Sequence, residues 1–303
     1  MKKFEIALDW TPNTNHTGFF VAQELGYYQE AGLDVQILSP ADDNYATTPA
    51  KKLEMGECDF AIAPFESVIS LNTKAKKVNA VAIAALLQED ISSIVTLASS
   101  DISRPKELDG RSYASYQARY EDTIVKQMII NDGGQGTLDI MYPEKLGIWE
   151  TLLEKKANST WIFDNWEGVE AETNGLKLNH FRLANYQIPY AYSPVIMTTQ
   201  EKLVENREQY RTFLQATKRG FQQAIHNPKQ AVGTLTNYLP ERDIKMINLG
   251  KSQEFVAPYY GDEATWGKME KARIALFLRW LVGHGLESEA VFEQQLFTND
   301  LLA

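Results

Sequence analysis

The residues of this sequence that could do chemistry gather first in Leu8 to Ala22, LDWTPNTNHTGFFVA, between an apolar run and a helical pattern. A loop that only has to turn needs Gly, Asn or Pro and little else. Trp10 instead offers a flat apolar face, and Asn13 and His16 offer groups that can hydrogen-bond a heterocycle. The alternative is that the indole fills the core and the amides shape the turn. We predict that Trp10, Asn13 and His16 contact a ligand.

A second junction between a strand and a helix, Ala63 to Ser67, contributes Phe65 and Glu66 as candidate ligand contacts. Ser67 is expected to cap the helix, because its hydroxyl can accept a hydrogen bond from a backbone N–H of the first turn. Phe65 could instead pack in the core, and Glu66 could simply compensate the positive end of the helix dipole. The sequence leaves both roles open.

Three tyrosines stand in the segment Tyr113 to Tyr120, which holds no glycine. A phosphate is usually bound by backbone N–H groups that approach it closely, and glycines permit that approach. The segment therefore offers rings and hydroxyls. Tyr116 is its candidate ligand contact, and Arg119 is its single candidate for contact with an anion.

Two further aromatic segments supply the remaining candidates. Trp166 and Glu167 follow a predicted strand, and a carboxylate there could accept hydrogen bonds from an aminopyrimidine edge or hold a cationic amine. Glu167 could also be only a charge at a helix N-terminus. Tyr190 and Tyr192 belong to a stretch with two prolines, where they could form an aromatic wall or brace a hinge.

Catalytic and metal-binding patterns are missing from the sequence. The four histidines have no metal-ligand spacing, and there is no GxSxG, no GxGxxG after the first strand and no GxxxxGK[ST]. The single cysteine, Cys58, allows no intrachain disulfide and no all-cysteine metal site. We therefore expect no cofactor, no metal and no catalytic residue, and a protein that binds its ligand rather than converting it.

The composition excludes several classes of protein. The chain has 303 residues, 44% hydrophobic and 23% charged, which is typical of a globular protein with one large or two ordinary domains. A formal charge of −10 without clustered Lys and Arg argues against nucleic acid as a partner. No run reaches the roughly 18 apolar residues of a membrane span, so no membrane insertion is expected. The first ten residues contain no apolar signal core, which predicts a cytoplasmic protein; a chain that had lost its signal would look the same and would be periplasmic or membrane-anchored outside the cell.

Short apolar runs alternate with helical patterns up to about Thr199, which predicts two α/β series with parallel sheets covered by helices. Strands are expected at residues 4–8, 33–38, 59–63, 80–87, 93–98, 112–115, 138–142, 160–163 and 194–199. Helices are expected at residues 18–31, 49–55, 67–74, 120–131, 148–155, 166–173, 207–226, 228–238, 241–249 and 266–282.

No flexible linker separates the two series, which suits two lobes joined by strands that cross between them. We expect lobe 1 to comprise residues 1–91 and 195–303, with a helical tail, and lobe 2 to comprise residues 92–194. A ligand is then expected in an interlobe cleft, outside the carboxyl ends of both sheets, where the junction segments described above would meet.

Four stretches resemble a family of substrate-binding proteins: LDWTPNTNHTGFFVAQELGYYQEAGLDVQIL, KKLEMGECDFAIAPFESV, RPKELDGRSYASY and DNWEGVEAE. That family includes binding proteins for thiamine pyrimidines, sulfonate-binding proteins and the thiamine pyrimidine synthase, and the resemblance covers about residues 4 to 235. It implies the type II periplasmic-binding-protein fold, in which two α/β lobes close on a ligand by hinge motion. It also implies that ligand-contacting positions fall on Trp10, Asn13, His16, Glu167 and Tyr190 or Tyr192.

The resemblance to the synthase branch fails at the residues that its chemistry needs. That branch uses pyridoxal phosphate held by a lysine and a glycine-bearing phosphate loop, a donated histidine, iron and a cysteine-rich motif. The lysine position falls on Ala63 and the histidine position near Ser67. The loop falls on residues 114–119, without glycine, and the cysteine motif on about residues 189–193, without cysteine. Alanine has no amine with which to bond the cofactor.

We therefore expect a ligand-binding protein for a pyrimidine precursor of thiamine, of the formylaminopyrimidine or hydroxymethylpyrimidine type. It would serve ABC-type uptake or thiamine salvage, with an ABC permease as partner. The ring is expected between Trp10 and a tyrosine, with Glu167 accepting from the ring nitrogen and the exocyclic amine. Two alternatives stay open, a cytoplasmic enzyme of thiamine pyrimidine biosynthesis and a sulfonate-type solute binder.

Overall fold

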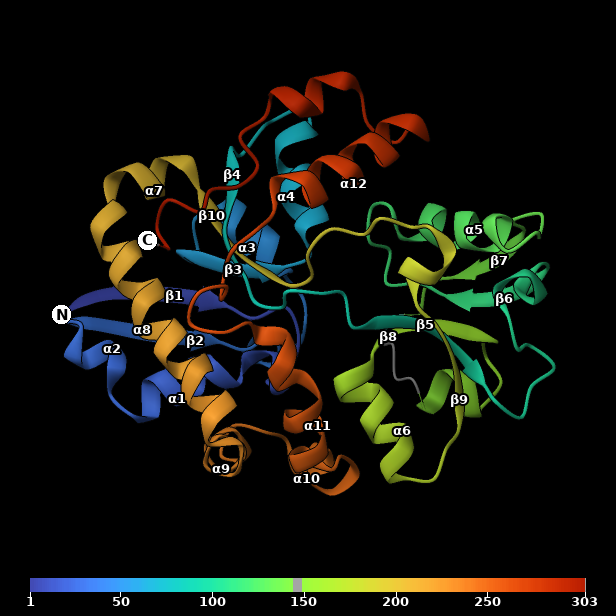
Figure 1. Cartoon of the computed structure of the whole chain (residues 1–303), viewed down its shortest axis with the longest axis horizontal. Coiled ribbons are helices and arrows are strands. Elements are labelled where there is room, and N and C mark those ends of the chain that lie inside the picture. Colours follow the sequence, from blue (N-terminus) through green and yellow to red (C-terminus); the bar gives the residue numbers. More distant parts are fainter. Residues whose placement is uncertain (144–148, 303) are drawn as a thin grey trace. The chain divides into compact units, whose positions relative to one another are not determined.

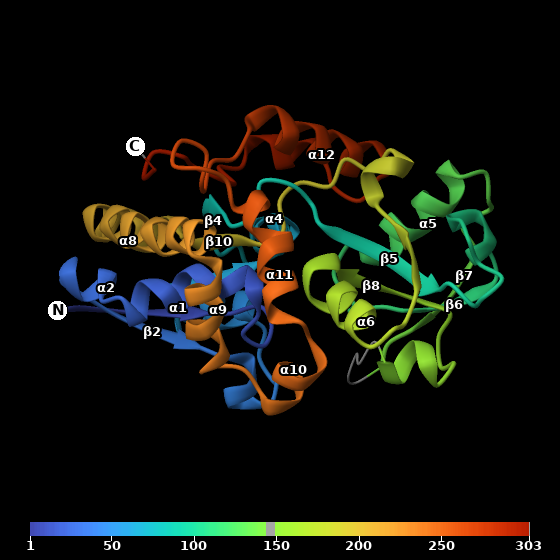
Figure 2. The same cartoon turned by 60° about the horizontal axis from the view of Figure 1, so that its bottom comes forward.

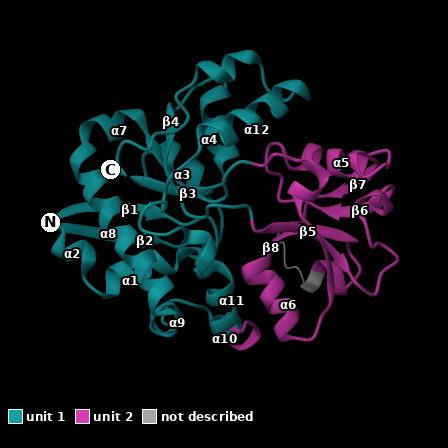
Figure 3. Cartoon of the chain, viewed as in Figure 1, with its two compact units in different colours: residues 1–90, 191–244, 249–303 teal, residues 91–190, 245–248 magenta. Residues whose placement is uncertain are grey.

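The computed structural model describes residues 1–143 and 149–302, and the chain divides into two units (Figure 3). Unit 1 comprises residues 1–90, 191–244 and 249–303, and unit 2 comprises residues 91–190 and 245–248. Each unit holds one five-stranded sheet with helices around it.

The short stretch Lys245–Asn248, which the sequence-based division left in lobe 1, belongs to unit 2. Asn174 Nδ2 donates a hydrogen bond to Met246 O at 2.8 Å, and Asn248 N donates one to Thr173 Oγ1 at 3.1 Å. Hydrogen bonds between segments so far apart in the sequence are not encoded in a local pattern, so the division by sequence missed them.

The sheet of unit 1 has the strand order β2-β1-β3-β10-β4. Its strands are β1 (Lys2–Ala7), β2 (Leu33–Leu38), β3 (Phe60–Ala63), β4 (Ala80–Ala85) and β10 (Val195–Thr199). β1 is parallel to β2 and β3, whereas β10 is antiparallel to β3 and β4. All six side chains of β4 are buried, as its unbroken apolar run predicted.

The sheet of unit 2 has the strand order β7-β6-β8-β5-β9 and repeats the same arrangement. Its strands are β5 (Ser92–Leu97), β6 (Arg111–Ala114), β7 (Leu138–Met141), β8 (Ser159–Phe163) and β9 (Leu178–Phe181). β6 is parallel to β7 and β8, and β5 is antiparallel to β8 and β9. Both sheets are therefore mixed rather than parallel throughout, because the strand with which the chain enters unit 2 (β5) or returns to unit 1 (β10) runs against its neighbours.

Most of the helices belong to unit 1. They are α1 (Thr17–Glu24), α2 (Tyr27–Glu30), α3 (Pro49–Met55), α4 (Phe65–Thr73), α7 (Gln200–Glu205), α8 (Arg207–His226), α9 (Pro228–Thr236), α11 (Leu249–Val256) and α12 (Lys271–Gly283), with 3-10 turns at Thr14–His16, Pro40–Asp43, Ala257–Tyr260 and Glu289–Glu293. α10 (Glu241–Met246) runs from residues of unit 1 into residues of unit 2. Among the helices that the structure describes, none combines the length and the apolar character needed to span a membrane.

Unit 2 holds α5 (Glu121–Asn131), α6 (Val169–Thr173), 3-10 turns at Pro105–Leu108 and Leu183–Tyr186, and single π-helical turns at Trp149–Leu153 and Asp164–Gly168. The helix expected at 166–173 thus begins two residues earlier and starts with a π turn. Of the helix expected at 148–155, Ile148 lies outside the described residues.

Local sequence signals located some helix ends and missed others. The Thr48 side chain accepts from Lys51 N at 3.2 Å and Gly56 ends α3 with φ of +76°, both as expected. The single helix expected at 18–31 is instead two helices, because Gly26 takes a left-handed φ of +74° between them. Ser67 does not cap α4, which begins two residues earlier, after Pro64.

A close crossing of α1 and α8 anchors the segment that follows β1. A Cβ on Gly220 would lie 2.0 Å from Gly18 O, and a Cβ on Gly18 would lie 2.1 Å from the ring of Phe221. Figures 1 and 2 show the two helices side by side. Two glycines therefore let the backbones approach closely, and α1 is held firmly where the loop after β1 ends.

Candidate functional site

The loop after β1 is built around a fully buried histidine. Asn13 N donates to His16 Nδ1 at 3.3 Å, and His16 Nε2 lies 2.8 Å from Asp9 Oδ1. Because a backbone N–H can only donate, Nδ1 accepts and Nε2 carries the proton that Asp9 accepts. The imidazole, 0% exposed, therefore ties the start of the loop to its end.

The Asn13 side chain completes this loop. Its Oδ1 accepts from Asn15 N at 2.8 Å, and its Nδ2 donates to Thr11 O at 3.0 Å. Asn13 is thus the N-cap of the Thr14–His16 turn, the role that the sequence left as the alternative to ligand contact. Since both polar ends of Asn13 and both ring nitrogens of His16 bond within the loop, these residues hold its shape. Their direct contact with a ligand stays a prediction.

The half-buried indole of Trp10 pairs with a tyrosine that sequence reasoning missed. The ring centroids of Trp10 and Tyr45 lie 5.5 Å apart with an interplanar angle of 56°. Tyr45 is 42% exposed, and burial of its hydroxyl raises its pKa, against the effect of a hydrogen bond with Thr11. The two rings form one aromatic surface at the end of β1 that is partly open to a ligand.

Asp9, beside Trp10, is a second residue that the sequence analysis did not single out. Its side chain is 19% exposed, and the bond to His16 uses one carboxylate oxygen, Oδ1. The carboxylate is therefore oriented by His16 and remains partly accessible. The Asp9 carboxylate and the indole of Trp10 in this loop, together with the ring of Tyr45 from the segment after β2, are groups that can stack on a flat heterocycle and accept hydrogen bonds from its amine.

The other candidates of unit 1, Phe65, Glu66 and Tyr192, are buried. Phe65 N donates to Tyr192 O at 2.9 Å. The Tyr192 hydroxyl accepts from Glu270 N at 2.8 Å, and the Arg273 guanidinium lies 4.3 Å from the centre of its ring. These contacts bind the start of β10 to the beginning of α12, which is a bracing role. Ligand contact by these three residues also stays a prediction.

In unit 2, Glu167 lies in the π turn that follows β8. Its Oε2 accepts from Phe163 N at 3.0 Å, and the residue is half-buried. Trp166 is buried, whereas Trp161 on β8 is half-buried and pairs with Tyr190 at a centroid distance of 5.4 Å. The indole beside Tyr190 is therefore Trp161, which the sequence analysis did not choose; its alternation with the buried neighbours Thr160 and Ile162 was the available signal.

Tyr116 shares a neighbourhood with Glu167. The residue is 39% exposed as a whole, yet burial of its hydroxyl and the charges of Glu167 and Glu121 raise the pKa of Tyr116 well above its usual range. Unit 2 thus brings together Tyr116 and Glu167, as the sequence suggested, and adds Glu121, a residue that it did not single out.

Two groups among the described residues have side chains of the types used in nucleophilic chemistry, the group around Asp164 and Cys58. Asp164 accepts from Ser93 Oγ at 3.0 Å and from Arg182 at 3.1 Å, and lies 2.8 Å from His180 Nδ1. The carboxylate stands between the hydroxyl and the imidazole, whereas an activated serine needs the imidazole in the middle. Burial raises the pKa of the Cys58 thiol to about 12, so it is not a thiolate at neutral pH. Among the described residues, no group of three or more His, Cys, Asp or Glu side chains could hold a metal ion.

The residues that carry pyridoxal phosphate in the synthase branch have no equivalent in this geometry. Ala63 is buried at the end of β3 and supplies only a methyl group. In the segment after β6, Tyr116 N and Ala118 N already donate to the carboxylate of Glu121. The structure therefore does not fit that cofactor.

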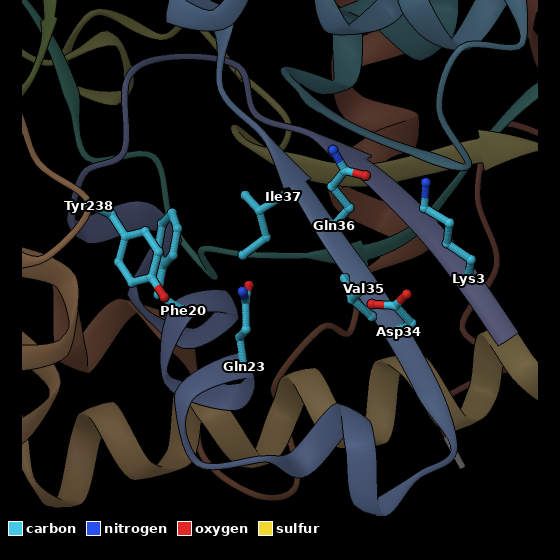
Figure 4. A pocket seen from close by; sticks show the side chains of 8 residues that line it. All are labelled: Lys3, Phe20, Gln23, Asp34, Val35, Gln36, Ile37 and Tyr238. Atoms are coloured by element: carbon cyan, nitrogen blue, oxygen red, sulfur yellow. The ribbon is translucent and has the colours of Figure 1, made fainter. Parts of the chain in front are cut away.

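A pocket of about 330 Å³ lies elsewhere in unit 1, against the edge strand β2 (Figure 4). Its aromatic wall is Phe20 and Tyr238, stacked at 4.3 Å, and burial together with a hydrogen bond to Glu24 raises the pKa of Tyr238 to about 12. None of the residues chosen from the sequence lines this pocket.

Comparison with known proteins gives a family and two informative relatives. The family model described as NMT1/THI5 like matches residues 13–231. A formylaminopyrimidine-binding protein of Halalkalibacterium halodurans is 22% identical over an alignment that covers 99% of this chain and 90% of that protein. A 4-amino-5-hydroxymethyl-2-methylpyrimidine phosphate synthase of Legionella pneumophila is 24% identical over 78% of this chain and 73% of that protein.

Solved structures share the fold at low sequence identity. The periplasmic nitrate-binding protein NrtA from Synechocystis PCC 6803 superposes with a TM-score of 0.73 at 14% identity, covering 99% of this chain and 87% of that one. The alkanesulfonate-binding protein SsuA from Xanthomonas axonopodis pv. citri, bound to MOPS, gives 0.72 at 8% identity, covering 98% and 99%. These similarities confirm the predicted type II periplasmic-binding-protein fold.

Proposed function

We propose that this chain, which belongs to the NMT1/THI5-like family, binds a pyrimidine precursor of thiamine such as formylaminopyrimidine or hydroxymethylpyrimidine. The observation that carries the proposal lies at the end of β1, where the half-buried Trp10 pairs with the exposed Tyr45 and is next to Asp9 in the chain. The relatives support a ligand-binding role, and these residues suit an aromatic amine as the ligand.

The chemistry of an aminopyrimidine matches these groups. Its ring is flat and apolar on both faces, so it can stack on the indole of Trp10. Its exocyclic amine is a donor, and a carboxylate is a strong acceptor for it. The carboxylate of Asp9 in unit 1 is one candidate acceptor, and that of Glu167 in unit 2 is the alternative. Glu167 already accepts a backbone hydrogen bond through Oε2, which orients its carboxylate.

The biological setting that we propose is uptake or salvage of the pyrimidine. Solved proteins of this fold include the periplasmic binding proteins named above. A binding protein of this type would release its ligand to an ABC permease, and it would then act outside the cytoplasmic membrane.

Titration calorimetry with formylaminopyrimidine, hydroxymethylpyrimidine, thiamine and an alkanesulfonate tests the proposal. We expect heat with at least one of the two precursors, and at least about tenfold weaker binding of the sulfonate, because a sulfonate brings negative charge to a site whose candidate acceptors are carboxylates. The Trp10→Ala variant should bind the pyrimidine roughly 30- to 150-fold more weakly, whereas Trp280→Ala, which removes a half-buried indole from α12, should leave the affinity unchanged. Folded protein that gives no heat with any pyrimidine would refute the proposal, and tight sulfonate binding would favour the alternative.

A further inference from the structure

The segment between β6 and α5 has the form of an anion-binding cradle. Three consecutive backbone N–H groups, those of Tyr116, Gln117 and Ala118, all donate to side chains of unit 2. They lie just before the N-terminus of an eleven-residue helix. Backbone N–H groups placed in this way between a strand and a helix are the usual binding site of a phosphate.

In this chain the cradle is filled by a carboxylate of the protein itself. Tyr116 N donates to Glu121 Oε1 at 3.0 Å, and Ala118 N donates to Glu121 Oε2 at 3.1 Å. The Tyr113 hydroxyl donates to Oε1 at 2.6 Å. Glu121 is 2% exposed, so the carboxylate is an internal part of the segment rather than a mobile surface group.

A second carboxylate lies beside the first. Asp122 Oδ1 accepts from Ser115 Oγ at 2.7 Å, and Asp122 Oδ2 accepts from the Tyr142 hydroxyl at 2.7 Å. Ser115 Oγ in turn accepts from Gln117 N at 3.0 Å. The third N–H group of the cradle, that of Gln117, is therefore linked to the Asp122 carboxylate through the Ser115 hydroxyl. All three N–H groups thus donate to a carboxylate directly or through one hydroxyl.

The cation of the segment is Arg119, which follows the three cradle residues. The Arg119 guanidinium lies over the ring of Tyr120, 5.1 Å from its centre, and the Arg119 side chain is exposed. On the other side, the charges of Glu121 and Glu167 both act on the Tyr116 hydroxyl. A dianion near Tyr116 would meet the negative charges of Glu121 and Glu167. The three backbone N–H groups of the cradle already donate to other acceptors.

We infer that Glu121 occupies the phosphate cradle of unit 2 and so restricts the ligand to pyrimidines without a phosphate group. The inference rests on the proposed function, in which Tyr116 and Glu167 are candidate ligand contacts. It names the class of ligand more closely: an uncharged or cationic aminopyrimidine with a free hydroxymethyl or formylamino group, and not its phosphate ester. Glu121 is then a specificity-determining residue that acts through its own charge and through the donors that it occupies.

The test compares 4-amino-5-hydroxymethyl-2-methylpyrimidine with its phosphate ester, which carries a charge of about −1.5 to −2 at neutral pH. Calorimetry of the unmodified ligand is followed by displacement of that ligand with the ester. We expect the ester to bind at least about a hundredfold more weakly, since its charge meets carboxylates at short range. Equal or tighter binding of the ester would overturn the inference while leaving the proposed function intact. Binding of neither compound would overturn both.

The salt dependence of ester binding gives a second measurement that needs no variant. If carboxylates repel the ester, raising the salt from about 0.03 M to about 0.3 M should tighten its binding relative to the alcohol, because ions screen the repulsion. If instead Arg119 attracts the ester, added salt should weaken its binding. The second result would overturn the inference.

A pair of variants isolates the cradle from the general acidity of the segment. Glu121→Gln removes the buried charge and should narrow the preference for the alcohol by about tenfold. Asp122→Asn also removes one negative charge, but Asp122 accepts no hydrogen bond directly from the N–H groups of the cradle. This variant should therefore narrow the preference for the alcohol over the ester less than Glu121→Gln does. An equal effect of the two variants would overturn the assignment of the cradle to Glu121. If circular dichroism shows that Glu121→Gln does not fold, the alcohol-to-ester ratio and its salt dependence in the unmodified protein decide the question.

Discussion

The loop after β1 in unit 1 and the segment after β6 in unit 2 solve the same local problem by different chemistry. Each leads from a strand into a helical segment, and each has backbone N–H groups that need acceptors. In unit 1 the acceptors are neutral, Asn13 Oδ1 and His16 Nδ1. In unit 2 the acceptor is the buried carboxylate of Glu121. The only carboxylate of the first loop, Asp9, is 19% exposed and bonds the His16 ring, whereas Glu121 of the second segment is 2% exposed and bonds backbone N–H groups.

The two aromatic pairs differ in a similar way. Trp10 and Tyr45 in unit 1, and Trp161 and Tyr190 in unit 2, have centroid distances of 5.5 and 5.4 Å and the same interplanar angle of 56°. Tyr45 is 42% exposed, however, whereas Tyr190 is 9% exposed. Equal ring geometry therefore does not mean equal availability, and the pair in unit 1 is the better candidate for stacking on a ligand. The predictions below test these differences.

The largest effect is expected on the stability of the loop in unit 1. His16→Ala removes a fully buried ring and leaves Asn13 N without its acceptor and Asp9 without its donor. We expect a loss of about 3 kcal/mol in the free energy of unfolding, measured by urea denaturation. The matched control is His226→Ala at the exposed end of α8, which should change it by less than about 0.5 kcal/mol. Similar losses in both variants would contradict the role given to His16.

A smaller effect, on ligand affinity, is expected when the indole of either aromatic pair is removed. Trp10→Ala should weaken binding of the pyrimidine by about 2–3 kcal/mol, or roughly 30- to 150-fold, because it removes the stacking face. Trp161→Ala should weaken it by no more than about tenfold, since its partner Tyr190 is buried. Calorimetry of both variants measures the difference. A larger loss in Trp161→Ala would reverse the comparison between the units.

The partly buried carboxylate of Asp9 in unit 1 should contribute less to ligand affinity than the indole of Trp10. Asp9→Asn keeps an oxygen that can accept from His16 Nε2, so the loop should retain its shape and its stability. It removes the anionic acceptor, and we expect binding of an aminopyrimidine to weaken by about 1–2 kcal/mol. Unchanged affinity in a variant of unchanged stability would remove Asp9 from the site and leave Glu167 as the candidate acceptor.

The smallest effect concerns the buried carboxylate of unit 2 and its response to pH. Burial raises the pKa of Glu121, against the effect of the hydrogen bonds from Tyr113, Tyr116 and Ala118. A carboxyl group with a raised pKa contributes most stability below its unfolded pKa of about 4.3, and this contribution falls as the pH rises through the folded pKa. The stability of the unmodified protein relative to Glu121→Gln should therefore decrease as the pH is raised from about 4. Denaturation curves at several pH values measure it, and a difference that grows with pH would show that hydrogen bonding outweighs burial.

Much of the fold could be predicted because its signals are local. The Thr48 cap and Gly56 bounded α3, and an uninterrupted amphipathic pattern gave both ends of α8. The failures have equally local causes. Gly26 permitted a left-handed turn within what the pattern predicted as one helix. Ser67 was expected to cap α4, but the helix begins at Phe65, directly after Pro64. The helix expected at 241–249 is instead α10, which ends at Met246, and the separate helix Leu249–Val256 was not predicted.

The sequence by itself determined the family, the two α/β series and the strand ends at which aromatic and polar residues accumulate, because those properties depend on neighbours along the chain. Only the tertiary structure decided which residues meet. Tyr45 reaches Trp10 from 35 positions away, His16 turns inward to orient Asp9, and Glu121 fills the cradle after β6. Such pairings depend on the path of the backbone and on the buried donors that need an acceptor, and a linear pattern records neither.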